Sequence, residues 1–249
     1  MITFHGLDFS YDRRSFMRDL SLTWRNGCIT GLVGPNGSGK STCLKLAANL
    51  LSPQSGQIMI DGKDLSLLKG RSLGRNISYL PQHRPVPAIT VKSMVSHGRF
   101  PHTGMGRKLS PADWEAVNEA LTVTGLENLA DRDLRTLSGG QQQKAYLALL
   151  MAQNAPHVLL DEPTTYLDIR HQLELFELLK GFRSRNKCVV VVLHDLNQAF
   201  SLCDEVQLLH EGRLLSAGSP SLLAEDEAVS QVFGVRPVRR EGLDFDLLA

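Results

Sequence analysis

The sequence predicts an α/β protein with a parallel sheet covered by helices on both faces and a mostly helical insert. Apolar, β-branched runs alternate with helical segments before about residue 86 and after Pro156, a pattern typical of strands buried on both sides. From about Val91 to Asn154 the periodicity is helical instead. A glycine-rich loop also stands between a predicted strand and a predicted helix. With 249 residues and 42% hydrophobic content, the chain can form one large domain or two lobes.

The first part of the chain is expected to be mainly strands. Apolar runs bounded by glycine and proline predict strands at 2–9, 20–24, 29–33, 57–61 and 77–80. One long helix is expected from Lys40, because helical periodicity continues through residues 43–51. In the insert, Ser110-Pro111-Ala112-Asp113 predicts a capped start for a helix over 114–124, and a second long helix is expected over 139–153.

After Pro156 the alternation of strand and helix returns. The patterns predict strands at 157–161 and 188–193, and helices at 169–184 and 196–203. Strands at 206–210 and 213–217 flank Glu211-Gly212 and read as a hairpin. The tail from about Val235 has no clear pattern and predicts no function.

Composition excludes several classes of function. Lys and Arg total 27 against 26 Asp and Glu, a net charge of +1, so no bulk field attracts nucleic acid or an anionic membrane. The apolar run Cys188–Leu193 is far shorter than the roughly 20 residues that cross a bilayer. Met1 leads into polar alternation without the features of a secretory signal, which favours the cytoplasm. The four scattered cysteines favour neither disulfides nor a zinc site and are expected to be small core residues.

The stretch Gly34–Thr42 fits the phosphate-loop pattern G-x-x-x-x-G-K-[ST] without a mismatch. Glycines let successive backbone N–H groups point at phosphate oxygens, at the positive end of the following helix. Lys40 is then expected at the β- and γ-phosphates. Ser41 offers a hydroxyl to Mg²⁺, which binds few protein oxygens besides phosphate and water. The loop therefore predicts a nucleotide triphosphate site.

Two further patterns suit the same chemistry. The apolar run Val158–Leu160 ends in Asp161 and Glu162, and in phosphate-loop enzymes such acids serve the metal and the attacking water respectively. Ser138 and the following Gly139-Gly140 begin a helix with a capping hydroxyl and bare N–H groups, a second anion-binding design. Two such helix starts are hard to explain by one nucleotide site within one subunit.

The order of these motifs resembles the nucleotide-binding subunit of an ABC transporter over nearly the whole chain. The matched positions are Tyr11 for adenine stacking, Gly34–Thr42 as Walker A, Gln82 in Tyr79-Leu80-Pro81-Gln82 as the Q-loop glutamine, Leu137–Gln141 as the signature, Val158–Glu162 as Walker B, Leu167-Asp168 as the D-loop and His194 as the switch histidine. The departures at Cys43, Gln142 and Lys144 do not touch phosphate chemistry.

The resemblance implies an ABC-type P-loop core, with a mixed sheet flanked by helices and an N-terminal antiparallel β subdomain, plus a helical subdomain. It implies one domain over 1–237, with a catalytic lobe at 1–86 and 156–237, a helical lobe at 87–155, and a tail at 238–249. The expected catalytic residues are Lys40, Gln82, Glu162 and His194, and the expected Mg²⁺ site is Ser41, Gln82 and Asp161. The expected ATP contacts are Tyr11, Gly34, Pro35, Asn36, Gly37, Ser38, Gly39, Lys40, Ser41, Thr42, Ser138, Gly139, Gly140, Gln141 and Asp168.

The resemblance also implies partners. Two copies pack head to tail, so that Ser138–Gln141 of one covers ATP held by the other, and hydrolysis drives separate permease subunits at the cytoplasmic face of the inner membrane, served indirectly by a substrate-binding protein. No nucleic acid partner is expected.

The cargo is expected from a resemblance within the family. Gly98–His102, Thr164–Asp168 with His171-Gln172, and Leu193–Gln198 look like the importers of iron–siderophores, haem and cobalamin, with ferric siderophore favoured. Two alternatives stay open. An ABC ATPase outside transport usually has two cassettes or long insertions, and a small-molecule kinase would leave Leu137–Gln141 and His194 unused.

Overall fold

We describe a computed structural model of the chain at residues 1–12, 14–103, 108–165 and 167–235. Its larger sheet has six strands in the order β10-β9-β3-β8-β7-β6. Their bounds are β3 (Cys28–Val33), β6 (Ile77–Leu80), β7 (His157–Leu160), β8 (Cys188–Val192), β9 (Glu205–His210) and β10 (Arg213–Gly218). Every neighbouring pair is parallel except β9 with β10, which form the predicted hairpin.

A smaller antiparallel sheet has the order β2-β1-β4-β5. Its strands are β1 (Ile2–Tyr11), β2 (Arg14–Trp24), β4 (Ser55–Ile60) and β5 (Lys63–Asp64). It packs with α1 (Lys40–Ala47) against one face of the larger sheet. The mixed sheet and the N-terminal antiparallel sheet confirm the predicted fold class.

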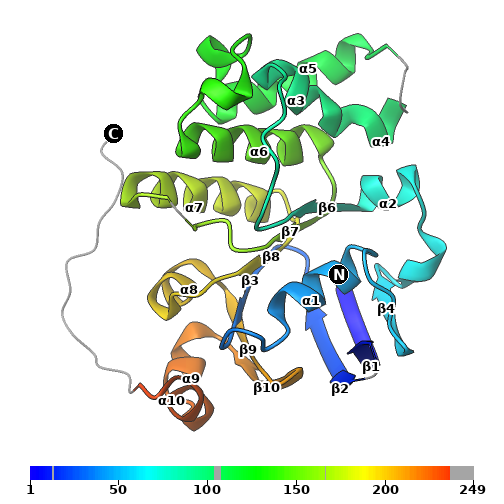
Figure 1. Ribbon diagram of the computed structural model, residues 1–249, viewed down its shortest axis with the longest axis vertical. Helices are drawn as coiled ribbons and strands as arrows, with labels where there is room; N and C mark the ends of the chain where they lie inside the picture. The colour runs from blue at the N-terminus through cyan, green and yellow to red at the C-terminus, as the bar shows by residue number, and fades with distance from the viewer. Residues whose placement is uncertain (13, 104–107, 166, 236–249) are drawn as a thin grey trace.

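The remaining helices include the inserted group drawn in green at the top of Figure 1. The α-helices are α2 (Arg71–Asn76), α3 (Val91–Ser96), α4 (Phe100–Thr103), α5 (Pro111–Val123), α6 (Gly139–Gln153), α7 (Ile169–Ser184), α8 (Leu196–Leu202), α9 (Pro220–Ala224) and α10 (Glu227–Phe233). Short 3-10 turns lie at Leu65–Leu67, His97–Arg99, Glu127–Leu129 and Leu134–Thr136. Among the described residues, no helix combines the length and apolar character that crossing a membrane requires.

The two faces of β8 separate two hydrophobic cores. All five of its residues are buried. Val189 and Val191 belong to the core that also contains buried residues of α3, α5, α6 and α7, whereas Val190 and Val192 belong to the core formed with α1 and the smaller sheet. Side chains alternate across a strand, so a continuous apolar run is what a central strand covered on both faces needs.

Some elements differ from those predicted. The helix from Lys40 ends at Ala47, because Asn49 adopts a left-handed backbone with φ of 56°. The short helix α2 and the C-terminal helices α9 and α10 were not expected. Helix α2 has no buried residue, so it lacks the apolar stripe by which a helix is recognised in sequence. The predicted tail at 238–249 lies outside the described residues.

Candidate nucleotide site

The phosphate loop joins β3 to α1 with three glycines in the left-handed region. Gly34, Gly37 and Gly39 have φ of 149°, 79° and 110°. Gly34 also lies against the backbone, since a Cβ there would be 2.0 Å from the carbonyl oxygen of Leu209. Only glycine satisfies both conditions.

Lys40 occupies the centre of this loop. Its Nζ donates to the carbonyl oxygens of Gly34 at 2.8 Å and Pro35 at 3.0 Å. Burial lowers the pKa of Lys40, while Glu162 and Asp161 oppose that shift. The buried Oγ of Ser38 has no hydrogen-bond partner. A buried ammonium paired only with neutral carbonyls and an unpaired hydroxyl suit a phosphate group.

Asp161 and Ser41 lie together, as predicted. Ser41 Oγ donates to Asp161 Oδ1 at 2.8 Å, and the Tyr79 hydroxyl donates to Asp161 Oδ2 at 3.3 Å. Burial raises the pKa of Asp161, nearby Glu162 adds to the rise, and the bond from Ser41 opposes it. The contact of Tyr79 was not predicted. It follows from the pairing of β6 with β7, which no local sequence pattern specifies.

Three predicted residues meet where neighbouring parallel strands end. Gln82, Glu162 and His194 follow β6, β7 and β8, which are adjacent in the sheet. Gln82 Nε2 contacts Glu162 Oε2, and His194 Nε2 lies 2.5 Å from Glu162 Oε1. Glu162 itself has φ of 50°, an uncommon backbone conformation for a side-chain-bearing residue. Gln82 therefore lies against Glu162, and its predicted place on Mg²⁺ stays a prediction.

The aromatic ring of Tyr11 stands beside the loop. Its hydroxyl lies 3.0 Å from Thr42 Oγ1, and its ring packs edge-on against Phe9 and Phe16. The residue is 45% exposed. A partly exposed ring at this place can stack on a base, and the predicted stacking on adenine stays a prediction.

The second predicted anion site lies at the start of α6. Ser138 Oγ accepts a hydrogen bond from Gln141 N, and Gln141 Oε1 accepts one from Ser138 N, which makes a capping box. Asp168 caps α7 and bonds His171, also at an exposed position. Among the described residues, no hydrogen bond or ion pair joins Ser138, Gln141 or Asp168 to the phosphate loop. The structure does not bring the two helix starts together within one chain.

Residues 17–165 of the chain match the ABC transporter family. The chain is 37% identical over 232 residues to the ferric enterobactin transport ATP-binding protein of Escherichia coli, covering 92% of this chain and 86% of that one. It is 38% identical over 237 residues to a petrobactin import ATP-binding protein of Bacillus anthracis, covering 94% and 87%.

Among solved structures, the chain resembles a dimeric bacterial ABC transporter cassette. The TM-score is 0.76 at 27% identity, with 88% of this chain and 99% of that one covered. Together with the loop, the acids and the signature helix, these similarities identify the chain as an ATP-binding subunit of the ABC transporter family and as an ATPase.

Proposed function

We propose that the chain hydrolyses ATP in a head-to-tail dimer to drive ferric siderophore import through permease subunits. The observation that carries the proposal is the separation of its two anion-binding helix starts. The loop before α1 has an unpaired buried Ser38 hydroxyl, whereas Ser138 caps α6 in an exposed position. A second copy, supplying Ser138–Gln141 and Asp168, completes each site. The dimeric cassette to which the chain is similar supports this arrangement.

The proposed division of labour follows from the contacts. Lys40 binds the β- and γ-phosphates, because they offer its buried ammonium the negative charge that backbone carbonyls lack. Glu162 accepts a proton from the attacking water, while His194 and Gln82, which touch its carboxylate, orient the water and the γ-phosphate. Tyr11 stacks on adenine. Positioning and electrostatics thus supply most of the catalysis.

The residues beside the loop fit Mg²⁺. Ser41 and Asp161 present hard oxygen donors 2.8 Å apart, and the described residues include no group of three or more His, Cys, Asp or Glu that could hold a metal alone. Such a sparse donor set suits an ion that keeps water and phosphate ligands. Bound there, Mg²⁺ would supply charge neutralisation for the departing phosphate.

The lobes and partners complete the proposal. Residues 1–86 and 156–237 act as the catalytic lobe and 87–155 as the helical lobe that meets the permease. The subunit then works at the cytoplasmic face of the inner membrane, with a substrate-binding protein as indirect partner. Siderophore cargo is supported by the relatives named for ferric enterobactin and petrobactin. Haem or cobalamin is the alternative cargo, and an ABC ATPase outside transport is the less favoured one.

The catalytic proposal is tested by Glu162→Gln. We expect ATP binding to persist and turnover to fall at least 10²-fold, since a general base contributes roughly 10²–10⁴-fold. Steady-state ATPase activity and nucleotide binding are measured on the purified subunit. The matched control is Glu177→Gln, because Glu177 is an exposed residue on α7 paired with Lys180. Turnover within threefold of the parent in Glu162→Gln contradicts the assignment.

The transport proposal is tested separately. We expect the subunit to co-purify with an integral membrane permease when both are expressed, and the complex to take up a ferric siderophore in preference to haem or cobalamin. Uptake of haem or cobalamin without uptake of the siderophore would show that the proposed cargo is wrong. ATPase activity without any association with a permease would favour the non-transport alternative.

A further inference from the structure

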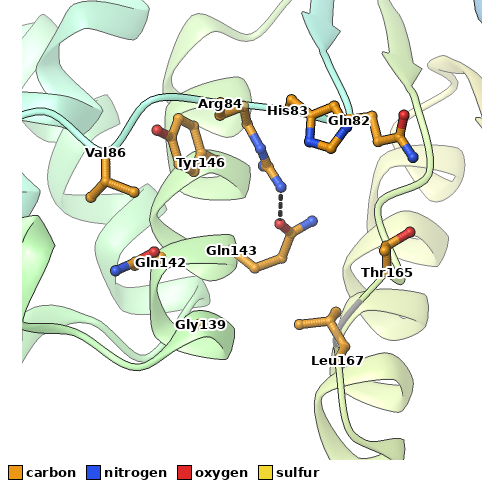
Figure 2. A pocket seen from close by; sticks show the side chains of 10 residues that line it. All are labelled: Gln82, His83, Arg84, Val86, Gly139, Gln142, Gln143, Tyr146, Thr165 and Leu167. Carbon is orange, nitrogen blue, oxygen red and sulfur yellow. Dashed lines mark hydrogen bonds between the residues drawn. The ribbon is translucent and has the colours of Figure 1, made fainter.

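Gln143 is a buried glutamine on α6 that none of the predicted roles includes. It is 6% exposed, and both ends of its amide are bonded. Nε2 donates to the carbonyl oxygen of Pro163 at 2.9 Å, and Oε1 accepts from the Arg84 guanidinium. Figure 2 shows the Arg84 contact beside a cavity of about 220 Å³. One side chain therefore joins α6 to two loops of the core.

The first of these loops carries Glu162. Pro163 follows Glu162 directly, is buried, and has a fixed φ. Glu162 holds a left-handed backbone with φ of 50°, which a non-glycine residue keeps only when its surroundings impose it. The bond from Gln143 Nε2 anchors the Pro163 carbonyl, one peptide beyond Glu162, so it helps to hold the turn in which Glu162 adopts that conformation.

The second loop carries Gln82. Arg84 lies two residues after Gln82, and its guanidinium carbon is 4.5 Å from the centre of the Tyr146 ring, one turn beyond Gln143 on α6. Since Gln82 also touches the Glu162 carboxylate, Gln143 closes a ring of contacts around Glu162. Burial lowers the pKa of Arg84. Its guanidinium is therefore removed from water where it contacts the neutral amide of Gln143 and the ring of Tyr146.

We propose that Gln143 is a positioning residue for Glu162, which ties the placement of the catalytic carboxylate to the orientation of α6. This inference rests on the proposed role of Glu162. The helix that Ser138 caps thus also holds, through Gln143, the loop that carries Glu162, the proposed base of the same subunit. A movement of α6 relative to the core would act on Glu162 through the Pro163 carbonyl and through Arg84.

The test is Gln143→Glu, which keeps an oxygen for Arg84 but removes the donor to Pro163. Losing one hydrogen bond that orients a reacting group is expected to lower kcat about tenfold, with KM for ATP within twofold. The control is Gln153→Glu on the same helix, because Gln153 Nε2 donates to the carbonyl oxygens of Gly74 and Ile77, away from the site. It should lose stability to a similar degree and keep kcat within twofold.

A second measurement separates positioning from a wider defect. In a Glu162→Gln background, adding Gln143→Glu should leave ATP-dependent dimerisation unchanged in size-exclusion chromatography. If Gln143→Glu is insoluble, Gln143→Met replaces it in both measurements, because it removes the same hydrogen-bond donor. The proposal is overturned by a kcat within threefold of the parent, by a KM rise that accounts for the loss, or by loss of the dimer in the double variant. Activity retained by Glu162→Gln alone would instead refute the role of Glu162 itself.

Discussion

Gly139 and Gly140 are adjacent in the signature sequence, but they have different surroundings within the subunit. A Cβ at Gly139 would meet nothing within 4 Å. A Cβ at Gly140 would lie 2.5 Å, 2.6 Å and 2.8 Å from Cδ2, Nε2 and Cγ of the His171 ring. We therefore expect Gly140→Ala to destabilise the isolated subunit and Gly139→Ala to leave its stability unchanged or slightly raised.

The magnitude follows from the contact. Ordinary van der Waals contact begins at 3.4 Å, so the His171 ring would have to retreat by roughly 1 Å. That ring is held by Asp168, whose Oδ1 lies 2.7 Å from His171 Nδ1 and also accepts from His171 N at 2.9 Å. Overpacking of this kind costs about 1–3 kcal/mol, and alanine in place of glycine in a helix returns about 0.5–1 kcal/mol. The net loss in the free energy of unfolding should be about 1–2 kcal/mol.

The assay is urea denaturation of the nucleotide-free subunit, so that effects on the dimer do not enter. Gly139→Ala is the matched control, and His171→Ala combined with Gly140→Ala should recover most of the loss, because the obstructing ring is gone. Equal stabilities of Gly139→Ala and Gly140→Ala would refute the close packing of Gly140 against the His171 ring. A double variant less stable than the sum of the Gly140→Ala and His171→Ala effects would refute it as well.

Two other predictions concern buried charge. Arg99→Met removes the cationic partner that lies 2.9 Å from Asp113 in a pair that is 14% and 7% exposed, and leaves that carboxylate with only its hydrogen bonds from Ser110. The unfolding free energy should therefore fall by about 3 kcal/mol, whereas Arg135→Met, at an exposed pair, should cost under about 1 kcal/mol; equal losses would contradict this. Burial lowers the pKa of Lys187 to about 8 from 10.5. Between these values the unfolded chain binds more protons, so stability should rise with pH, by about 3 kcal/mol over the whole interval relative to Lys187→Met. Parallel pH curves of parent and variant in urea denaturation would exclude the effect.

The motif of residues 98–102, which by resemblance indicates the group of iron–siderophore, haem and cobalamin importers, has a packing role in the structure. Arg99 Nη1 donates to the Ala152 carbonyl and His102 Nε2 lies 2.8 Å from the Gln153 carbonyl, both at the C-terminal end of α6. Gly98 approaches the same helix, since a Cβ there would lie 2.5 Å from the Leu149 carbonyl oxygen. The motif thus provides hydrogen-bond partners for the last carbonyl groups of α6 and fixes the position of that helix end.

Features that depend on a few neighbouring residues could be predicted from the sequence. The spacing of glycines, Lys40 and Ser41 identifies a phosphate loop because the backbone of that loop is built from consecutive residues. The helices over Gly139–Gln153 and Ile169–Ser184 were predicted to the residue, because a serine and an aspartate cap their starts.

Contacts between segments far apart in the chain could not be predicted from the sequence and became visible in the folded structure. Glu162 meets Gln82 and His194 because β6, β7 and β8 are neighbours in the sheet, and strand order is not encoded in any local pattern. Gln143 likewise resembles any other polar residue on a helix until its amide is seen between Arg84 and Pro163. Local backbone and capping preferences act over a few residues, whereas the environment of the catalytic carboxylate depends on packing across 80 residues of chain.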